Sequence, residues 1–212
     1  MGGVTVNIRP ARPADVRAIR ALVEPYAQER ILLAKEWVGY YEAVQEFLVA
    51  EDSVEDGGRA TDGPEGAVTS VAGVAARAAD VRIPERSGVT GTAPTPASAV
   101  VGCGALHVMW EDLAEVRTLA VDPAARGRRV GHQLVEALLD RARGLGLRRV
   151  FCLTFEVEFF RKHGFEEIDS TPVSPDVYAE LLRSHDDGVA EFLDLARVKP
   201  NTLGNSRMLL EL

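Results

Sequence analysis

Segments of alternating apolar and polar residues predict the strands of this protein. Such alternation sends every second side chain to one face of a sheet, where the apolar side chains can be buried. We expect strands at residues 4–8, 46–50, 100–109, 115–121, 148–155, 166–169 and 206–212.

Apolar residues that recur every three to four positions predict the helices. The clearest stripe is formed by Val130, Leu134, Val135, Leu138, Leu139 and Ala142, in a helix that ends near Gly144. Further helices are expected from Asp15 onward and at residues 156–163 and 174–184. Pro25 should kink or end the first helix, and residues 26–38 should form a second, shorter helix or a loop.

Residues 51–98 interrupt this pattern. Gly, Ala, Pro, Ser, Thr, Asp and Glu dominate there, without sustained apolar periodicity. Such a composition buries too little apolar surface to offset the entropy of ordering the chain. We therefore expect a low-complexity, disordered insertion in the loop between the strands at 46–50 and 100–109, within a single domain that spans residues 1–212.

Composition narrows the classes of function. A net charge of −8 argues against a nucleic-acid surface. No apolar run approaches the about 20 residues of a membrane span, and the first residues do not resemble a signal peptide, so we expect a cytoplasmic protein without membrane contact. The four histidines show no metal-ligand spacing, so we expect no metal. A homodimer stays open as an alternative.

Residues 116–134, VRTLAVDPAARGRRVGHQL, predict a binding site for a pyrophosphate. A strand ends in an Asp-Pro turn, and an arginine-glycine loop then opens a helix. The first N–H groups of a helix are unpaired and carry partial positive charge, so they bind phosphates well. Arg126, Arg128 and Arg129 add charge, while Gly127 and Gly131 let the backbone approach a ligand closely.

This loop resembles motif A of the GNAT superfamily of acyl-CoA N-acyltransferases, written Arg/Gln-x-x-Gly-x-Gly/Ala. Arg126 and Gly131 match its first and last positions, whereas Arg129 replaces the middle glycine. The segments VGCGALHV, AEVRTLAVDP, RRVFCLTFEVEFFRKHGF and NSRMLLEL resemble the acetyltransferase domain of N-acetylglutamate synthases, in particular the single-domain actinobacterial type. The resemblance implies a mixed α/β fold in which a twisted sheet is flanked by helices.

The resemblance also implies acetyl transfer from acetyl-CoA to the α-amino group of L-glutamate or L-glutamine, the first step of arginine biosynthesis. The alternatives are a GNAT enzyme for another small amine and a CoA-binding sensor without turnover. The residues expected to contact acetyl-CoA are Leu119, Ala120, Val121, Arg126, Gly127, Arg128, Arg129, Val130, Gly131, His132 and Phe160.

Catalysis is expected to use Glu115 as general base, the backbone N–H of Leu119 as oxyanion donor, and the Thr154 hydroxyl to hold a water or the amine. Strand alternation places Glu115, Arg117, Leu119 and Val121 on one face of the sheet, opposite Val116, Thr118 and Ala120. Many GNAT enzymes have a tyrosine acid four residues before a Gly-Phe pair, but this chain has Phe160 there.

Binding of the amino acid requires cationic or amide partners for its carboxylate. Longer synthases carry a basic residue after an Ile-Leu pair and an Arg-x-Ser before the last strand, and the second pattern here reads Gly204-Asn205-Ser206. The missing arginine leaves room for glutamine as substrate. The expected substrate-binding residues are Lys35, Arg117, Asn205, Ser206 and Arg207.

Overall fold

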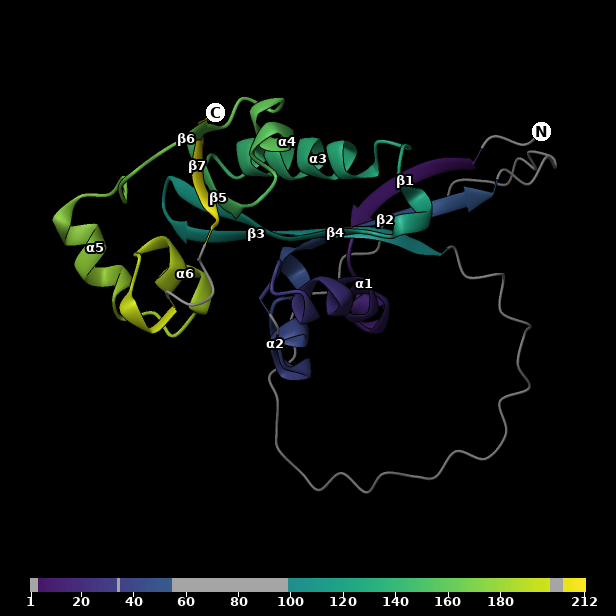
Figure 1. The fold of residues 1–212 in the computed structure, drawn as a ribbon, viewed down its shortest axis with the longest axis horizontal. Coiled ribbons are helices and arrows are strands. Elements are labelled where there is room, and N and C mark those ends of the chain that lie inside the picture. Colours follow the sequence, from purple (N-terminus) through teal and green to yellow (C-terminus); the bar gives the residue numbers. More distant parts are fainter. Residues whose placement is uncertain (1–3, 34, 55–98, 199–203) are drawn as a thin grey trace, which may run out of the picture. The chain divides into compact units, whose positions relative to one another are not determined.

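The computed structural model describes residues 4–33, 35–54, 99–198 and 204–212. In these residues the chain forms one seven-stranded mixed sheet in the order β1-β2-β3-β4-β5-β7-β6 (Figure 1). β4 and β5 run parallel, and the other neighbouring strands are antiparallel. The strands are β1 (Val4–Pro10), β2 (Phe47–Val54), β3 (Val100–Trp110), β4 (Leu113–Val121), β5 (Arg149–Thr154), β6 (Glu166–Glu167) and β7 (Ser206–Glu211). Each predicted strand is confirmed, with shifted ends.

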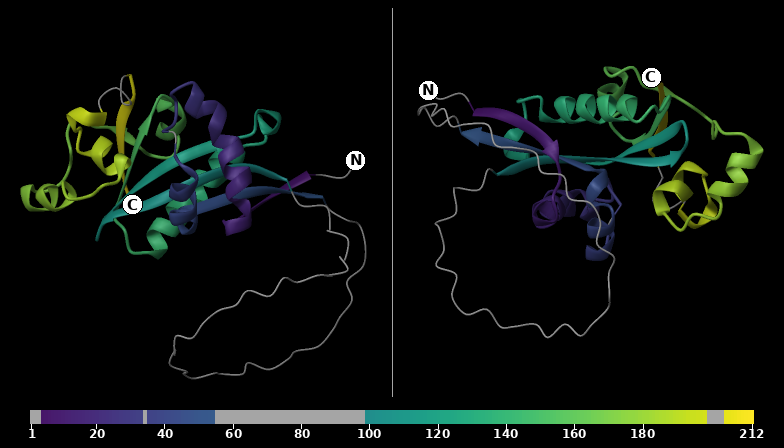
Figure 2. Two further views of the ribbon diagram at one scale, coloured as in Figure 1. Left: turned by 90° about the horizontal axis from the view of Figure 1, so that it is seen from below. Right: turned by 180° about the vertical axis from the view of Figure 1, so that it is seen from behind.

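Helices cover both faces of the sheet (Figures 1 and 2). They are α1 (Val16–Gln28), α2 (Trp37–Glu42), α3 (Val130–Gly144), α4 (Val157–Arg161), α5 (Pro175–Leu181) and α6 (Asp187–Phe192). The apolar stripe of α3 packs on one face, and the buried residues of α1 pack on the other with Phe47 and Ala105. Each face therefore has its own apolar core. No helix in the described ranges is long and apolar enough to cross a membrane.

Pro25 does not end the first helix, contrary to one of the two expected outcomes. It lies inside α1, which continues to Gln28. Val23 before it is fully buried, and Tyr26 after it packs against the same apolar cluster. Burial on both sides holds the helix together although proline has no N–H to donate. α2 begins only at Trp37, so most of residues 26–38 lie outside this second helix.

β2 is longer than predicted, so the expected insertion from residue 51 begins too early. The strand continues to Val54 and pairs with β1 as far as Val4. The apolar pattern did not predict this extension, because Glu51 and Asp52 are charged. The strand accommodates both carboxylates because Glu51 pairs with Arg9 and Asp52 pairs with Arg128. Antiparallel pairing of β2 with β3 confirms the hairpin. The proposed disorder concerns residues 55–98, which lie outside the described residues.

A β-bulge in β4 corrects the predicted alternation. Cys103 of β3 pairs with Ala120 of β4, and Ala105, two residues later, pairs with Arg117, three residues earlier. β4 therefore contains one extra residue. The extra residue fits at Thr118, whose φ of 56° is left-handed. As a result, the residues of β4 after Thr118 lie on the faces opposite to those that strict alternation predicts. Leu119 and Val121 pack on the α3 side together with Val116, whereas Ala120 joins the α1 side.

Candidate active site

Two cavities meet where β4 and β5 separate. The described parallel pairing joins Leu113–Glu115 only to Arg149–Phe151. Beyond it lie a larger cavity of about 910 Å³ and a smaller one of about 540 Å³. Thr118 and Leu153 contribute to the walls of both. The bulged residue of β4 therefore stands at the junction, where groups bound in the two cavities can meet.

The smaller cavity has the features of a pyrophosphate site. Its wall includes Leu119, Ala120 and Val121 of β4, and Arg126, Gly127, Arg129, Val130, Gly131 and His132 at the start of α3. Gly127 has a φ of +83°, and Arg129, which precedes the first residue of α3, has a φ of 60°. This left-handed geometry turns the loop so that the helix begins beside the cavity. The residues present therefore fit the phosphates of CoA.

Arg128 is the member of the arginine loop with a structural partner. Its two terminal nitrogens donate to the two Asp52 oxygens at 3.0 and 2.5 Å. The arginine lowers the pKa of the Asp52 carboxyl group through this hydrogen bond. Arg128 is not among the described residues lining either cavity, so its guanidinium ties the loop to β2 instead of facing the cavity.

Aromatic rings form a side wall of the smaller cavity. His132 Nδ1 lies 2.8 Å from His163 Nε2, and the His132 ring lies 4.7 Å from that of Phe159. Phe160 also lines the cavity, but it is buried and makes an edge contact with Phe165 in the core. Phe160 has no proton to give, so a leaving thiolate receives none from this position.

Glu115 is the buried carboxylate of the larger cavity. This residue is 3% exposed, and its Oε2 has no hydrogen-bond partner among the described residues. Arg117 Nη1 lies 3.7 Å from that oxygen. Burial raises the pKa of the Glu115 carboxyl group, and the charge of Arg117 opposes this rise. A buried oxygen that accepts no hydrogen bond, on a carboxyl group with a raised pKa, is suited to accept a proton.

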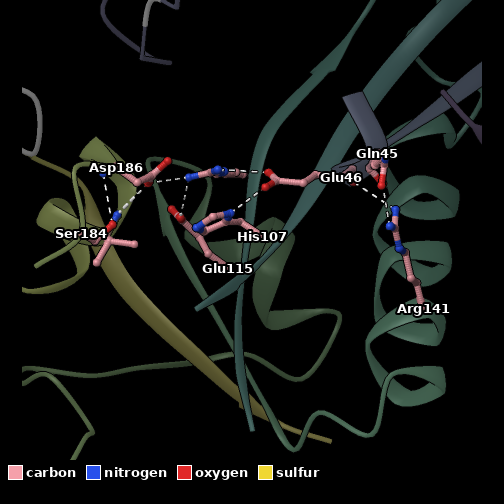
Figure 3. A network of polar contacts seen from close by, with 9 residues as sticks. Gln45, Glu46, His107, Glu115, Arg141, Ser184 and Asp186 are labelled. Atoms are coloured by element: carbon pink, nitrogen blue, oxygen red, sulfur yellow. Dashed lines mark hydrogen bonds and ion pairs between the residues drawn. The ribbon is translucent and has the colours of Figure 1, made fainter. Parts of the chain in front are cut away.

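Arg117 is the centre of an acidic cluster. Its Nη1 donates to Asp186 Oδ1 at 2.7 Å and its Nη2 donates to Glu46 Oε2 at 3.0 Å. Glu46 comes from the 3₁₀ turn η2 (Val44–Glu46), and its other oxygen lies 2.7 Å from His107 Nδ1. Figure 3 shows this network. Protein carboxylates thus hold both Nη groups of Arg117, whereas its buried Nε has no hydrogen-bond partner among the described residues.

The other predicted substrate residues divide into two groups. Lys35 and Asn205 line the larger cavity, and burial lowers the pKa of the Lys35 ammonium. Ser206 and Arg207 are absent from the described walls of both cavities. Ser206 donates to Glu167 at 3.0 Å, while Arg207 donates to the Glu191 carbonyl at 2.9 Å and lies over the Phe151 ring. These three contacts stabilise the structure around β7.

Thr154 lies at the end of β5 and lines the smaller cavity. Its hydroxyl oxygen accepts a hydrogen bond from the Glu156 N–H at 2.8 Å. The hydroxyl hydrogen stays available for another acceptor, as the expected role requires.

The structure adds site residues that the sequence analysis did not identify: Glu46, Asp186, Gly188 and Glu191. Three of them belong to α6 or its N-cap, Asp186, and this helix was not predicted. An aspartate followed by Asp187 and an apolar run was the available signal. A Cβ on Gly188 would lie 2.7 Å from Glu115 Oε2, so a larger residue at this position would displace the Glu115 carboxyl group.

The larger cavity is acidic. Its described lining includes seven carboxylates but only three lysine or arginine residues. Such a surface attracts an ammonium group and disfavours additional negative charge.

Comparisons with known proteins show which family the chain belongs to. The profile of the Acetyltransferase (GNAT) family matches residues 85–165. An amino-acid acetyltransferase of Mycobacterium tuberculosis is 49% identical over 205 residues, which cover 97% of this chain and 94% of the relative. The crystal structure of Rv2747 from M. tuberculosis, in complex with CoA and NLQ, superposes with a TM-score of 0.73 at 48% identity, covering 97% of this chain and 99% of that chain.

N-acetylglutamate synthase from Neisseria gonorrhoeae, complexed with coenzyme A and N-acetyl-glutamate, has a TM-score of 0.61 at 21% identity. The match covers 99% of this chain and 36% of that longer chain, and it supports the fold alone. The mycobacterial relative, in contrast, is matched over nearly its whole length. The chain therefore belongs to the GNAT family of acetyltransferases and is an amino-acid acetyltransferase that uses acetyl-CoA.

Proposed function

We propose that this enzyme transfers the acetyl group of acetyl-CoA to the α-amino group of L-glutamate or L-glutamine, the first step of arginine biosynthesis. The observation that carries the proposal is Glu115, a buried carboxylate beside the junction of the two cavities whose Oε2 accepts no hydrogen bond from the described residues. The 49% identical relative, named an amino-acid acetyltransferase, supports this class of substrate.

Acetyl-CoA would occupy the smaller cavity. The start of α3 and Arg126 would bind the pyrophosphate, and the backbone of Leu119 and Val121 would pair with the pantetheine as an added strand would. The thioester would then reach the junction at Thr118. Residues of β4 beyond Glu115 are not paired with β5 in the described structure, which leaves that side of the strand accessible to a ligand.

The amine would approach from the acidic cavity. Glu115 would take a proton from the ammonium group, and the free amine would attack the thioester carbonyl to form the C–N bond. The Leu119 N–H would stabilise the oxyanion. When the C–S bond breaks, CoA leaves as the thiolate, and the nitrogen of the adduct, which carries two protons, gives one to solvent water and keeps the other as the amide N–H. A thiol has a pKa of about 8.5, so this group leaves without a side-chain acid.

The acidic lining favours L-glutamine over L-glutamate. Both substrates have an α-ammonium group, which the carboxylates of the cavity attract, and an α-carboxylate. Glutamate has a second negative charge, on its side chain. The carboxylates of the cavity repel this side-chain charge at close range, unless a protonated group of the cavity donates a hydrogen bond to it.

A survey of substrates tests the proposal. We expect thiol release from acetyl-CoA with L-glutamine and L-glutamate, and far slower release with the other standard amino acids. Glu115→Gln should lose this activity, whereas Glu111→Gln, an exposed control with the same charge change, should keep it. Preference for an amine without an α-carboxylate would instead favour a different GNAT substrate class.

A further inference from the structure

A second buried acid faces the larger cavity from α6. Glu191 is 6% exposed and lines that cavity. It lies one helical turn after Gly188, so both residues share a face of α6. The position of Gly188 against Glu115 Oε2 shows that this face is turned toward the base. Neither the resemblance nor the predicted mechanism gives Glu191 a role.

Among the described residues, no cation forms an ion pair with the Glu191 carboxyl group. Both Nη groups of Arg117 are bound by Asp186 and Glu46. Arg207 reaches the Glu191 backbone carbonyl and not its side chain. In the described part of the chain, none of the hydrogen bonds or ion pairs involves this carboxyl group.

The charged groups around Glu191 favour its protonated form. Burial is the main cause, and the neighbouring carboxylates Glu115, Asp187 and Asp186 add to it, while Arg117 opposes it more weakly. Together they raise the pKa of Glu191 to about 8. A pKa above 7 means that the group carries its proton at neutral pH and loses it as the pH rises through about 8.

We propose that Glu191 determines substrate specificity: as a neutral carboxylic acid, it donates an O–H hydrogen bond to an oxygen acceptor of the amino-acid substrate. The acceptor is either a carboxylate oxygen or the side-chain amide oxygen, and the proposal rests on the function proposed above. A proton held in this position lets the acidic cavity bind an oxygen-rich substrate that an ionised Glu191 would repel.

Steady-state kinetics between pH 6.5 and 9.5 test this role. In the unaltered enzyme the KM for L-glutamine should be constant at low pH and should rise above about pH 8, approaching tenfold per pH unit. Glu191→Gln always has an amide donor, so its KM should stay within about threefold of the unaltered value at pH 7 and should lack the rise. Glu191→Ala loses the donor, and its KM should be about tenfold higher with kcat nearly unchanged. Glu180→Gln, an exposed control on α5, should match the unaltered enzyme.

Three ligands identify the acceptor: L-glutamine, L-glutamate and L-norvaline, which lacks the side-chain oxygen. If Glu191 contacts the side chain, Glu191→Ala should weaken binding of the first two and leave the KM or inhibition constant of norvaline unchanged. If it contacts the α-carboxylate, binding of all three should weaken. Unchanged KM values in Glu191→Ala, or an alkaline rise that persists in Glu191→Gln, would overturn the proposal while leaving the proposed function intact. Absence of turnover by the unaltered enzyme with both amino acids would overturn the proposed function and this role together.

Discussion

Thr118 shows how one residue can define the site. A β-branched residue with positive φ is rare, and such strain costs on the order of 1–3 kcal/mol. Here the bulge at Thr118 reverses the alternation of β4, so that Glu115 and Arg117 face the larger cavity while Leu119 packs on the α3 side. Strict alternation could not predict this reversal, because nothing in the local residue pattern indicates an extra residue.

Arg129 is a second residue in a left-handed conformation, where the family motif has glycine. That conformation costs a residue with a Cβ on the order of 1 kcal/mol. We expect Arg129→Gly to change acetyl-CoA affinity by less than about tenfold, because glycine adopts the same φ of 60° and lost charge offsets relieved strain. Arg126→Ala and Gly131→Val should weaken binding more. Calorimetric titration of acetyl-CoA into the three variants measures these affinities. A large loss of affinity in Arg129→Gly alone would mean that side-chain charge dominates phosphate binding.

At the scale of elements, the strands, the long helices α1 and α3, and the short helices α4 and α5 were predictable, and α6 was not. The apolar stripe of α3 spans about four turns, so its period is clear, and the predicted buried residues from Val130 to Ala142 and the end near Gly144 are confirmed. α6 has only six residues, too few for helical periodicity to stand out. Its contribution to the site depends on contacts between residues distant in the chain, which a local pattern does not contain.

Asp186 connects α6 to the site. Its Oδ1 caps the helix by accepting the Val189 N–H at 3.0 Å, and it also accepts from Arg117 at 2.7 Å. We expect Asp186→Ala to lower the free energy of unfolding by clearly more than the about 1 kcal/mol of a lost cap, since Arg117 is left buried with one partner fewer. Ser174→Ala is the matched control, because it removes the cap of α5 without an ion pair. Equal losses in urea denaturation would show that the ion pair contributes nothing.

At the scale of the whole molecule, the sequence resemblance predicted more than local pattern could. The fold, the family and the use of acetyl-CoA are confirmed. The acidic cluster was missed because its members Glu46, Arg117 and Asp186 come from three segments far apart in sequence. Folding of the sheet and packing of α6 bring them together. The roles proposed for Glu115 and Leu119 stay predictions.

The segment between β2 and β3 offers a test of the whole chain. Joining Val54 to Ala99 through a short Gly-Ser turn should preserve cooperative unfolding and acetyl transfer, because the ends of the segment are already close: Asp52 N donates to Ala99 O at 3.0 Å. Thermal unfolding and thiol release measure the outcome. Loss of a single cooperative transition would instead show that residues 55–98 stabilise the sheet.

The central claim is that Glu115 is the general base, and the pH dependence of kcat tests it most directly. Only the ionised carboxylate accepts a proton, and its pKa is raised, so kcat should increase with pH through a range above that of an ordinary glutamate. Glu115→Gln should lower kcat by roughly 10²-fold, remove this increase and leave the KM for acetyl-CoA nearly unchanged. A Glu115→Gln enzyme with the unaltered kcat and the same pH profile would contradict the account.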